Sequence, residues 1–241
     1  MNFSLSDVSE KGKSIRSLYN IFFEHYGPQG WWPLEILKEK GSNGYHPGDF
    51  SFPETSKQVF EIGLGAILTQ NTNWKQVEKT LSNLKEKTDL IPENILKADV
   101  EDLKAWIKPS GFFNMKVKKI ILFTKFFISL EGKVPSREEL LALWGVGEET
   151  ADSILLYGYK APVFVIDNYT IRIFKRLSGK NEKLNYTDLQ NIIFKAFKNM
   201  PLKEKVVVFS EYHALFVKHA KEYCRNKPLC NGCILREHCL Y

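Results

Sequence analysis

Apolar residues recur at helical spacing through the middle of this sequence, and this pattern limits the fold more than any other feature. Many of them have a partner three or four positions away, and the residues that carry the pattern are Val59, Phe60, Ile62, Leu64, Ile67, Leu68, Val77, Leu81, Leu84, Leu103, Trp106 and Ile107. Such a period places apolar side chains on one face of a helix. Proline and glycine breaks at Pro92, residues 109–111, residues 135–136, residues 145–147 and Pro162 divide residues 57–160 into short helices. The sequence therefore predicts an all-α fold with a compact helical bundle.

Local signals place further elements. Ser136 is followed three residues later by Glu139, a capping-box arrangement that predicts a helix running through Leu143. After Pro162, apolar spacing fits helices over residues 168–177, 188–197 and 203–219. Residues 163–166 have the composition of a strand, but no partner strand is evident nearby, so we expect an extended connector. Residues 41–49 contain three glycines and one proline and are expected to form a loop or linker.

The charge balance favours an anionic partner. Lys and Arg number 34 against 28 Asp and Glu, which gives a formal net charge of +6 and fits nucleic acid among other partners. The longest apolar stretch, residues 120–130, is interrupted by Lys125 and is shorter than the roughly 20 residues of a membrane span, so we expect a buried helix and no membrane partner. Residues 1–16 have no export signal, which predicts a cytoplasmic, nucleoid-associated protein.

All four cysteines lie near the end of the chain, with the spacing Cys224-x5-Cys230-x2-Cys233-x5-Cys239. In a reducing compartment, four thiols within 16 residues indicate a metal site, since disulfides would be unstable there. The spacing alone allows a [4Fe-4S] cluster or a zinc ion. Three cations, Arg225, Lys227 and Arg236, stand among these cysteines; they either contact a phosphate backbone or are solvated surface charges.

The sequence Gly145-Val146-Gly147 lies between two helical patterns and predicts a tight turn. Both glycines permit positive backbone angles, and without side chains in the way the N–H groups of the turn can approach a phosphate oxygen. A plain connection between two helices would have the same sequence. This motif therefore suggests DNA binding only together with other features.

Asp167 supplies that context, 20 residues beyond Gly147 and immediately before the next helical pattern. A carboxylate at this position could simply cap the helix. It would also stay ionised at a helix N-terminus, which suits the stabilisation of a cationic transition state or the orientation of a water molecule.

Taken together, these motifs resemble the endonuclease III superfamily, the helix-hairpin-helix DNA glycosylases, over residues 57–241. The resemblance rests on residues 66–72 (AILTQNT), residues 109–116 (PSGFFNMK), the hairpin at Gly145, Ile166 and Asp167 followed by Arg172, and the cysteines. It implies a six-helix barrel with the helix-hairpin-helix over residues 50–161. It also implies a second helical lobe from residues 1–49 and 162–241, bearing a [4Fe-4S] loop, with a DNA-binding cleft between the two lobes.

The resemblance also implies roles for individual residues. Asp167 would be the catalytic carboxylate, and the four cysteines would bind a [4Fe-4S] cluster, with zinc as the alternative metal. Gln70 would fill the space left by a flipped-out nucleotide. The residues expected on DNA are Gln70, Asn71, Gly145, Val146, Gly147, Arg172, Arg225 and Lys227. The expected partner is duplex DNA containing a damaged base, bound by a monomer.

Two positions depart from the family pattern. Bifunctional members have a lysine where this chain has Glu149, and without that amine the hairpin cannot form the Schiff base needed for strand cleavage. We therefore expect a monofunctional glycosylase. The first cysteine interval is one residue shorter than the common family spacing, which leaves the cluster type open.

Residues 31–33 (WWP), 68–72, 109–112 and 149–152 resemble the 3-methyladenine DNA glycosylases of the endonuclease III type. This subfamily resemblance implies an alkylated-purine substrate, with a base pocket that would include Trp31, Trp32, Phe60 and Phe112. A positively charged base is an activated leaving group, and no histidine occurs in the hairpin or the Asp167 segment to act as a general acid. Without the family, the two tryptophans would be read as core residues or a hydrophobic staple.

Two other functions stay open at this point. One is an endonuclease III-like glycosylase for oxidised pyrimidines, in which another lysine supplies the lyase activity. The other is a non-catalytic iron-sulfur protein that uses the hairpin and the cluster for DNA attachment alone. The presence of Asp167 argues against this second alternative.

Overall fold

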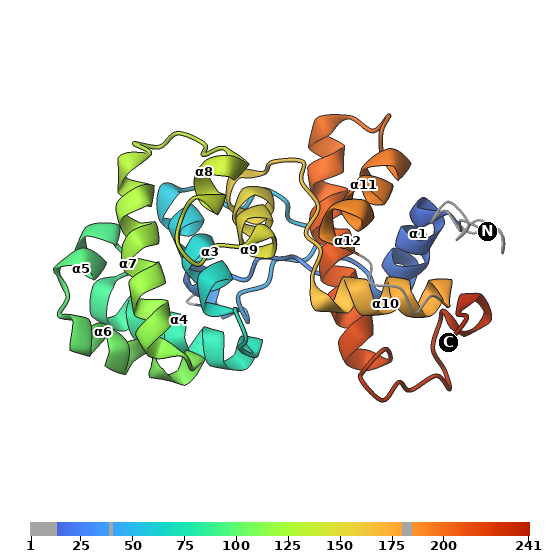
Figure 1. Cartoon of the computed structure of the whole chain (residues 1–241), viewed down its shortest axis with the longest axis horizontal. Helices are drawn as coiled ribbons and strands as arrows, with labels where there is room; N and C mark the ends of the chain where they lie inside the picture. The colour runs from blue at the N-terminus through green and yellow to red at the C-terminus, as the bar shows by residue number, and fades with distance from the viewer. Residues whose placement is uncertain (1–13, 39–40, 180–184) are drawn as a thin grey trace. The chain divides into compact units, whose positions relative to one another are not determined.

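Helices and turns make up the computed structural model, which describes residues 14–38, 41–179 and 185–241 (Figure 1). Residues 1–13, most of the segment expected to lack an export signal, lie outside the described residues. The longer helices are α1 (Ile15–Tyr26), α3 (Ser56–Leu68), α4 (Trp74–Thr88), α6 (Val100–Ile107), α7 (Phe113–Ser129), α10 (Asn168–Ser178), α11 (Tyr186–Ala196) and α12 (Leu202–Glu222). Shorter elements are α2 (Glu35–Lys38), α5 (Pro92–Lys97), η2 (Lys108–Ser110), α8 (Arg137–Leu141), α9 (Glu148–Ser153), η3 (Ile154–Gly158) and η4 (Arg236–His238). None of the described residues forms a β-strand, so the predicted all-α class is confirmed.

The chain divides into two compact units. The central unit is Trp32–Ala161, and the terminal unit combines Met1–Trp31 with Pro162–Tyr241. The sequence placed the first boundary after residue 49, whereas the structure places it after Trp31. Residues 32–49 therefore belong to the central unit, and their polar contacts give the reason.

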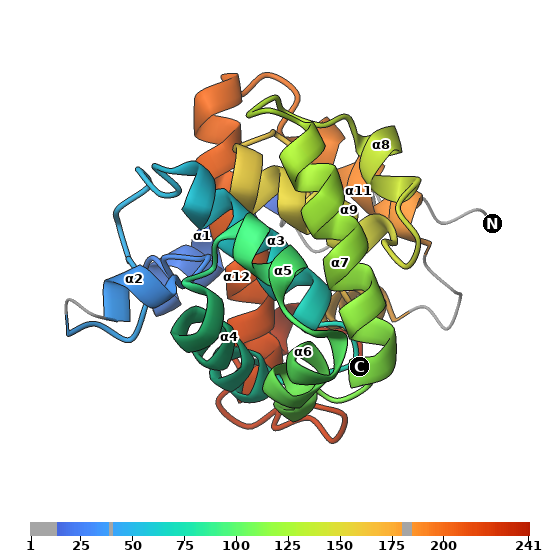
Figure 2. The ribbon, with the colours of Figure 1, turned by 90° about the vertical axis from the view of Figure 1, so that its left-hand side faces the viewer.

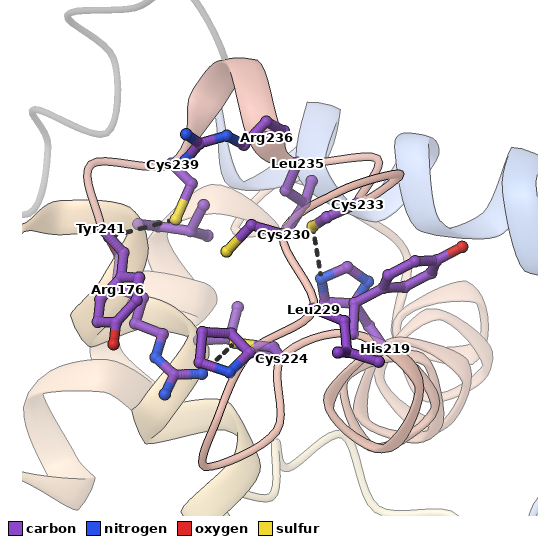
Figure 3. A pocket seen from close by; sticks show the side chains of 14 residues that line it. Arg176, His219, Cys224, Leu229, Cys230, Cys233, Leu235, Arg236, Cys239 and Tyr241 are labelled. Carbon is purple, nitrogen blue, oxygen red and sulfur yellow. Dashed lines mark hydrogen bonds between the residues drawn. The ribbon is translucent and has the colours of Figure 1, made fainter.

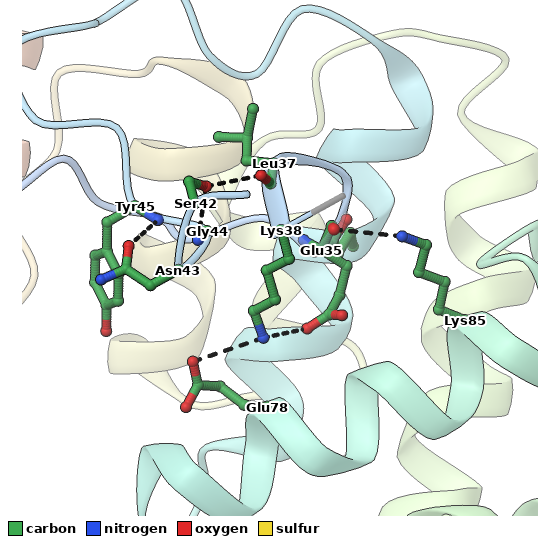
Figure 4. A network of polar contacts seen from close by, with 10 residues as sticks. Glu35, Leu37, Lys38, Ser42, Asn43, Gly44, Tyr45, Glu78 and Lys85 are labelled. Carbon is green, nitrogen blue, oxygen red and sulfur yellow. Dashed lines mark hydrogen bonds and ion pairs between the residues drawn. The ribbon is translucent and has the colours of Figure 1, made fainter. Parts of the chain in front are cut away.

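A polar network attaches α2 to the rest of the central unit (Figure 4). The Lys38 ammonium donates to the Glu35 carboxylate at 2.6 Å and lies 3.6 Å from the carboxylate of Glu78 on α4. Lys85, also on α4, donates to the backbone oxygen of Glu35 at 3.3 Å. The backbone N–H of Glu35 donates to Glu61 on α3 at 2.6 Å. These contacts join α2 to α3 and α4, and the loop predicted at residues 41–49 follows α2 within the same unit.

In the central unit, α3 packs against α4, α7 and η3 (Figure 2). Close approach of α3 and α7 depends on Gly63, because a Cβ atom there would overlap the ring of Phe123. Phe123 also stacks on Phe60, with ring centroids 5.9 Å apart and an interplanar angle of 6°. The capping box at Ser136 is confirmed, although α8 ends at Leu141 rather than Leu143.

In the terminal unit, α12 packs against α1 and α10. An aromatic core fills the contact with α1, where Phe22 meets Phe216 of α12 edge-on at 5.5 Å between ring centroids. Residues 163–166 are an extended connector, as predicted, and lead directly into α10. None of the helices in the described ranges is long and apolar enough to cross a membrane.

Candidate active site

Asp167 caps the N-terminus of α10 in the terminal unit. Its Oδ1 atom accepts two hydrogen bonds from Thr170, one from the backbone N–H and one from the side-chain hydroxyl, each 2.7 Å long. Its Oδ2 atom lies 3.7 Å from Nε2 of His213 on α12. Only 7% of Asp167 is exposed. Asp167 is therefore the helix cap, and it is also the residue expected to be the catalytic carboxylate. One of its oxygens is used by the cap, and the other faces His213.

The surroundings of Asp167 favour its ionised form. Burial is the largest influence and would by itself raise the pKa of the carboxyl group. The interactions with His213 and the hydrogen bonds from Thr170 outweigh burial and hold the pKa of Asp167 below its ordinary value. A carboxylate that is buried yet ionised can stabilise positive charge at short range.

His213 is a residue that sequence reasoning missed. No histidine occurs in the sequence segment around Asp167, but α12 brings His213 back to the start of α10 across 46 residues of sequence. A local motif search cannot find such a contact. The available signal was a histidine on the otherwise apolar face of a long predicted helix, where it is 4% exposed in the structure.

Trp31 lies on the same side of the terminal unit as His213. The two rings meet edge-on, with centroids 5.6 Å apart and an interplanar angle of 88°. The backbone before Trp31 is fixed on α12, since Glu211 accepts hydrogen bonds from Gln29 N at 2.6 Å and Gly30 N at 3.0 Å. Trp31 is partly exposed. The fold thus brings Asp167, His213 and Trp31 together from three separate segments.

The predicted hairpin lies between α8 and α9 in the central unit. Gly145 has a φ of +84°, and a Cβ atom there would overlap the side chain of Lys119. Gly147 instead has an extended backbone with a φ of −103°, so of the two glycines that permit a positive angle only Gly145 uses it. A Cβ atom at Gly147 would meet nothing within 4 Å, so the first N–H groups of α9 have open space beside them. Val146 between them is 9% exposed.

Gln70 is attached to this hairpin. Its Nε2 donates to Gly145 O at 3.0 Å and to Thr150 Oγ1 at 2.9 Å, while Lys119 donates to its Oε1. Asn71, the next residue, is exposed and has a φ of +53°. Gln70 and Gly145, which belong to different motifs and are both expected to contact DNA, therefore lie together in the central unit.

Lys116 organises the same region, although no role was predicted for it from the sequence. Its ammonium donates to Leu68 O at 2.7 Å, Thr72 Oγ1 at 2.6 Å and Ser110 O at 2.7 Å. Burial, followed by repulsion from Lys119, lowers the pKa of Lys116 to about 8. This buried cation joins the turn after α3 to the turn before α7.

The four expected base-pocket residues differ in exposure. Phe112 is 67% exposed on the turn before α7, whereas Phe60 is fully buried against Phe123. Trp32 is 6% exposed and packs edge-on against Trp74 and Tyr157 in the central unit. Phe60 and Trp32 are thus buried among neighbouring side chains, and their base-stacking roles stay predictions. Trp31 and Phe112 keep accessible ring surface.

Glu149 lies in the first turn of α9 and is exposed. The position at which bifunctional family members have a lysine therefore presents a carboxylate to solvent here. Lys119 lies against Gly145 of this hairpin; burial lowers its pKa, and its ammonium donates to Gln70.

All four cysteines line one pocket between α10, the end of α12 and the final loop (Figure 3). None of them forms a disulfide. Arg176 donates to Cys224 Sγ at 3.1 Å, and His219 Nε2 lies 3.6 Å from Cys233 Sγ. Within the described ranges, no three side chains of His, Cys, Asp or Glu converge closely enough to hold a single metal ion. The sulfurs surround a space rather than meet at a point.

The cations expected on DNA have different environments. Arg172 is turned towards the cysteine loop, where it donates to Cys224 O at 2.8 Å and lies 3.4 Å from Asn226 Oδ1. Arg225 donates to Lys221 O at 2.8 Å and is exposed, as is Lys227. Arg172 thus fixes the loop, and the exposed side chains of Arg225 and Lys227 are available to a polyanion.

A helical chain with a hairpin, a capped aspartate and a terminal four-cysteine loop has the features of a base-excision glycosylase. The sequence profile described as the HhH-GPD superfamily base excision DNA repair protein matches residues 64–199. The chain belongs to this superfamily and is a DNA glycosylase of base excision repair.

Individual relatives support the assignment. A Methanocaldococcus jannaschii protein, MJ1434, assigned by name as a DNA repair glycosylase, is 39% identical over 95% of this chain and 97% of its own. Endonuclease III of Thermotoga maritima is 30% identical over 78% of this chain and 86% of its own. The crystal structure of the Helicobacter pylori 3-methyladenine DNA glycosylase MagIII bound to 1,N6-ethenoadenine is similar, with a TM-score of 0.60 and 28% identity. It covers 78% of this chain and 96% of MagIII.

Proposed function

We propose that this protein is a monofunctional glycosylase that hydrolyses the N-glycosidic bond of an alkylated purine, such as 3-methyladenine, in duplex DNA, acting as a monomer. The observation that carries the proposal is the Asp167 carboxylate, which is buried and held ionised. It faces His213, and the ring of His213 in turn packs against the partly exposed ring of Trp31. A site that pairs a fixed anion with an aromatic ring suits a reaction in which positive charge develops next to a stacked base.

The proposed chemistry follows from that anion. As the base departs from a flipped nucleotide, the sugar becomes oxocarbenium-like, and the negative charge of Asp167 stabilises it. Thr170 occupies Oδ1, so Oδ2 is the oxygen left to face the sugar or to orient the attacking water. Water then completes the hydrolysis and leaves an abasic site.

The alkylated purine is favoured by its own charge. A cationic ring is an activated leaving group and binds an aromatic face more strongly than a neutral ring does, by roughly 1 to 2 kcal/mol when desolvated. Trp31 and Phe112 are the candidates for such contacts, since both keep exposed ring surface. MagIII, which is named as a 3-methyladenine glycosylase, is 28% identical to this chain and supports the same substrate class.

DNA attachment is proposed to use the hairpin and its neighbours. The open N–H groups around Gly147 and the N-terminus of α9 can face a phosphate. Gln70 would leave its present contacts to fill the gap after base flipping, and the exposed Asn71 would contact DNA beside it. The exposed Arg225 and Lys227 would add phosphate contacts, so that binding weakens as salt concentration rises.

The cysteine loop is proposed to hold a [4Fe-4S] cluster through Cys224, Cys230, Cys233 and Cys239. A zinc ion needs four sulfurs at about 2.3 Å from one point, whereas the irons of a cluster each take one thiolate, so the sulfurs surround a larger body. The four cysteines line one pocket, which supports a metal centre there, and the resemblance to the endonuclease III superfamily favours the cluster over the ion. Such a cluster supplies a covalent crosslink of the loop. Protein purified under anaerobic conditions should be brown and contain iron and sulfide; stoichiometric zinc without iron would reverse the assignment.

One experiment separates the candidate functions. Single-turnover release of 3-methyladenine is compared with release of thymine glycol and of mismatched uracil or thymine, and strand scission is measured separately. Release of methylated purine without scission supports the proposal. The relatives named Endonuclease III favour the second candidate, a glycosylase and lyase for oxidised pyrimidines. Rapid release of thymine glycol, or strong borohydride trapping of wild-type protein on DNA, would establish that second function despite Glu149.

The non-catalytic alternative is tested by the same assays. If Asp167→Asn changed no activity while DNA binding persisted, the protein would be a binding module. The matched control is Glu61→Gln, which neutralises a buried carboxylate in the central unit.

A further inference from the structure

We propose that His213 is a positioning residue that fixes the Oδ2 atom of Asp167. This inference rests on the proposed catalytic role of Asp167. His213 would touch neither the sugar nor the base and would act through the carboxylate alone.

The two oxygens of Asp167 are held by different means. Thr170 gives Oδ1 two hydrogen bonds of 2.7 Å from within α10. Among the described residues of α10, no group donates a hydrogen bond to Oδ2. This oxygen instead faces Nε2 of His213, a residue of α12, at a distance of 3.7 Å. A helix cap needs only Oδ1, so a second group at Oδ2 is more than the cap requires. The oxygen available for chemistry is thus the one that His213 controls.

Burial makes this contact strong. Asp167 is 7% exposed and His213 is 4% exposed, so water screens their interaction little. Trp31 lies edge-on to the imidazole ring at 5.6 Å and limits its rotation. The ring is therefore held between an aromatic side chain and the carboxylate.

The other charged and titratable groups near this pair are engaged elsewhere. On α12, Glu211 accepts from Gln29 N and Gly30 N. On α10, Arg172 and Arg176 donate to residues of the cysteine loop. At the start of α11, the hydroxyl of Tyr186 lies 3.4 Å from Ile166 N. The influences on the pKa of Asp167 are burial, His213 and Thr170. Removing His213 therefore leaves burial, which raises that pKa, opposed only by Thr170.

The test compares two replacements at one position. His213→Phe keeps a flat buried ring but removes the polar contact, whereas His213→Gln keeps a side-chain N–H donor. Single-turnover base release is measured from pH 5 to pH 8, with enzyme-free DNA as the correction for spontaneous depurination. His25→Gln, an exposed histidine of α1, is the control.

We expect His213→Phe to lose at least about tenfold in rate at pH 5 and distinctly less at pH 8, because Asp167 becomes easier to protonate. His213→Gln should recover most of the rate at pH 8. Binding to DNA containing a tetrahydrofuran abasic analogue should change by less than about threefold in both variants. A purely structural role predicts equal losses at every pH and no advantage of Gln over Phe, and that result would overturn the inference.

A second measurement is independent of catalysis. The carboxyl carbon of Asp167, identified by its absence from the ¹³C NMR spectrum of Asp167→Asn, is titrated in wild-type protein and in His213→Phe. A higher pKa of Asp167 in the variant than in wild type supports the inference. It does so even if the wild-type protein releases no base, which would reject the proposed function alone. Identical titrations would reject the role of His213.

Discussion

Two buried carboxyl groups, one in each unit, meet opposite conditions. Asp167 begins a helix, where Thr170 and His213 lower its pKa against the effect of burial. Glu61 lies within α3 and is 2% exposed; burial is the main cause that raises its pKa to about 7, and the Glu35 carboxylate adds to it. The hydrogen bond from Glu35 N and the charges of Lys85 and Lys38 oppose this rise without cancelling it.

The comparison shows that burial alone does not determine the charge of a carboxyl group. Position at a helix N-terminus and a histidine partner keep Asp167 ionised, whereas mid-helix placement near a second carboxylate favours the protonated form of Glu61. The first environment suits stabilisation of a cation. The second suits a structural hydrogen bond, the one that Glu61 accepts from α2.

Loss of charge should have its largest effect at Asp167. Asparagine caps helices as well as aspartate does, so Asp167→Asn should remain folded. We expect single-turnover base release to fall by about 10²- to 10³-fold, because the buried negative charge is absent from the transition state. Glu61→Gln should release bases within a few-fold of the wild-type rate. Equal losses in the two variants would show that the two carboxyl groups do not differ as described.

Loss of the carboxylate at Glu61 should instead raise the stability of the protein at high pH. A raised pKa means that the folded state holds the proton more tightly, so the contribution to stability is fully present below the ordinary value of 4.5 and is lost as pH rises to about 7. That difference of about 2.5 units corresponds to roughly 3 kcal/mol. Glu61→Gln should therefore match wild type near pH 4 and be more stable by up to this amount at pH 8. Chemical denaturation at both pH values measures the difference, and a less stable variant at pH 8 would contradict it.

The smallest effect is expected at Thr170. Thr170→Val removes the hydroxyl bond to Asp167 and retains the backbone bond, which should cost about 1 kcal/mol of stability at pH 7. Because the pKa of Asp167 is lowered, this contribution is present above the ordinary value of 3.8 and is lost as pH falls through the folded-state value. Thr124→Val is the control, since Thr124 is equally buried and donates to Ile120 O. Only the variant at Thr170 should slow base release.

Much of the fold could be predicted from the sequence because it depends on local signals. The helix expected over residues 168–177 is α10 at Asn168–Ser178, and that expected over residues 203–219 is α12 at Leu202–Glu222. The lobe boundary could not be placed in this way. A glycine- and proline-containing break at residues 27–30 precedes residues 32–49. Their membership of the central unit nevertheless depends on contacts such as that between Lys38 and Glu78, which lie far apart in the sequence.

The site was predicted in the same uneven way. Asp167 could be found because its role as an N-cap and its distance from the hairpin are written in one segment. His213 and Lys116 could not, because each acts on residues from other helices. The burial of Phe60 could not be predicted, because helical spacing shows that a residue belongs to an apolar face but does not show whether that face is covered.

The ammonium of Lys116 donates hydrogen bonds to Leu68, Thr72 and Ser110. These three bonds make the turn after α3 and the turn before α7 a single structural unit. A loop transplanted from a relative into only one of these turns would bring carbonyl and hydroxyl groups that do not match the other. Engineering of lesion preference in this protein therefore calls for exchange of both turns together with the lysine, as one cassette.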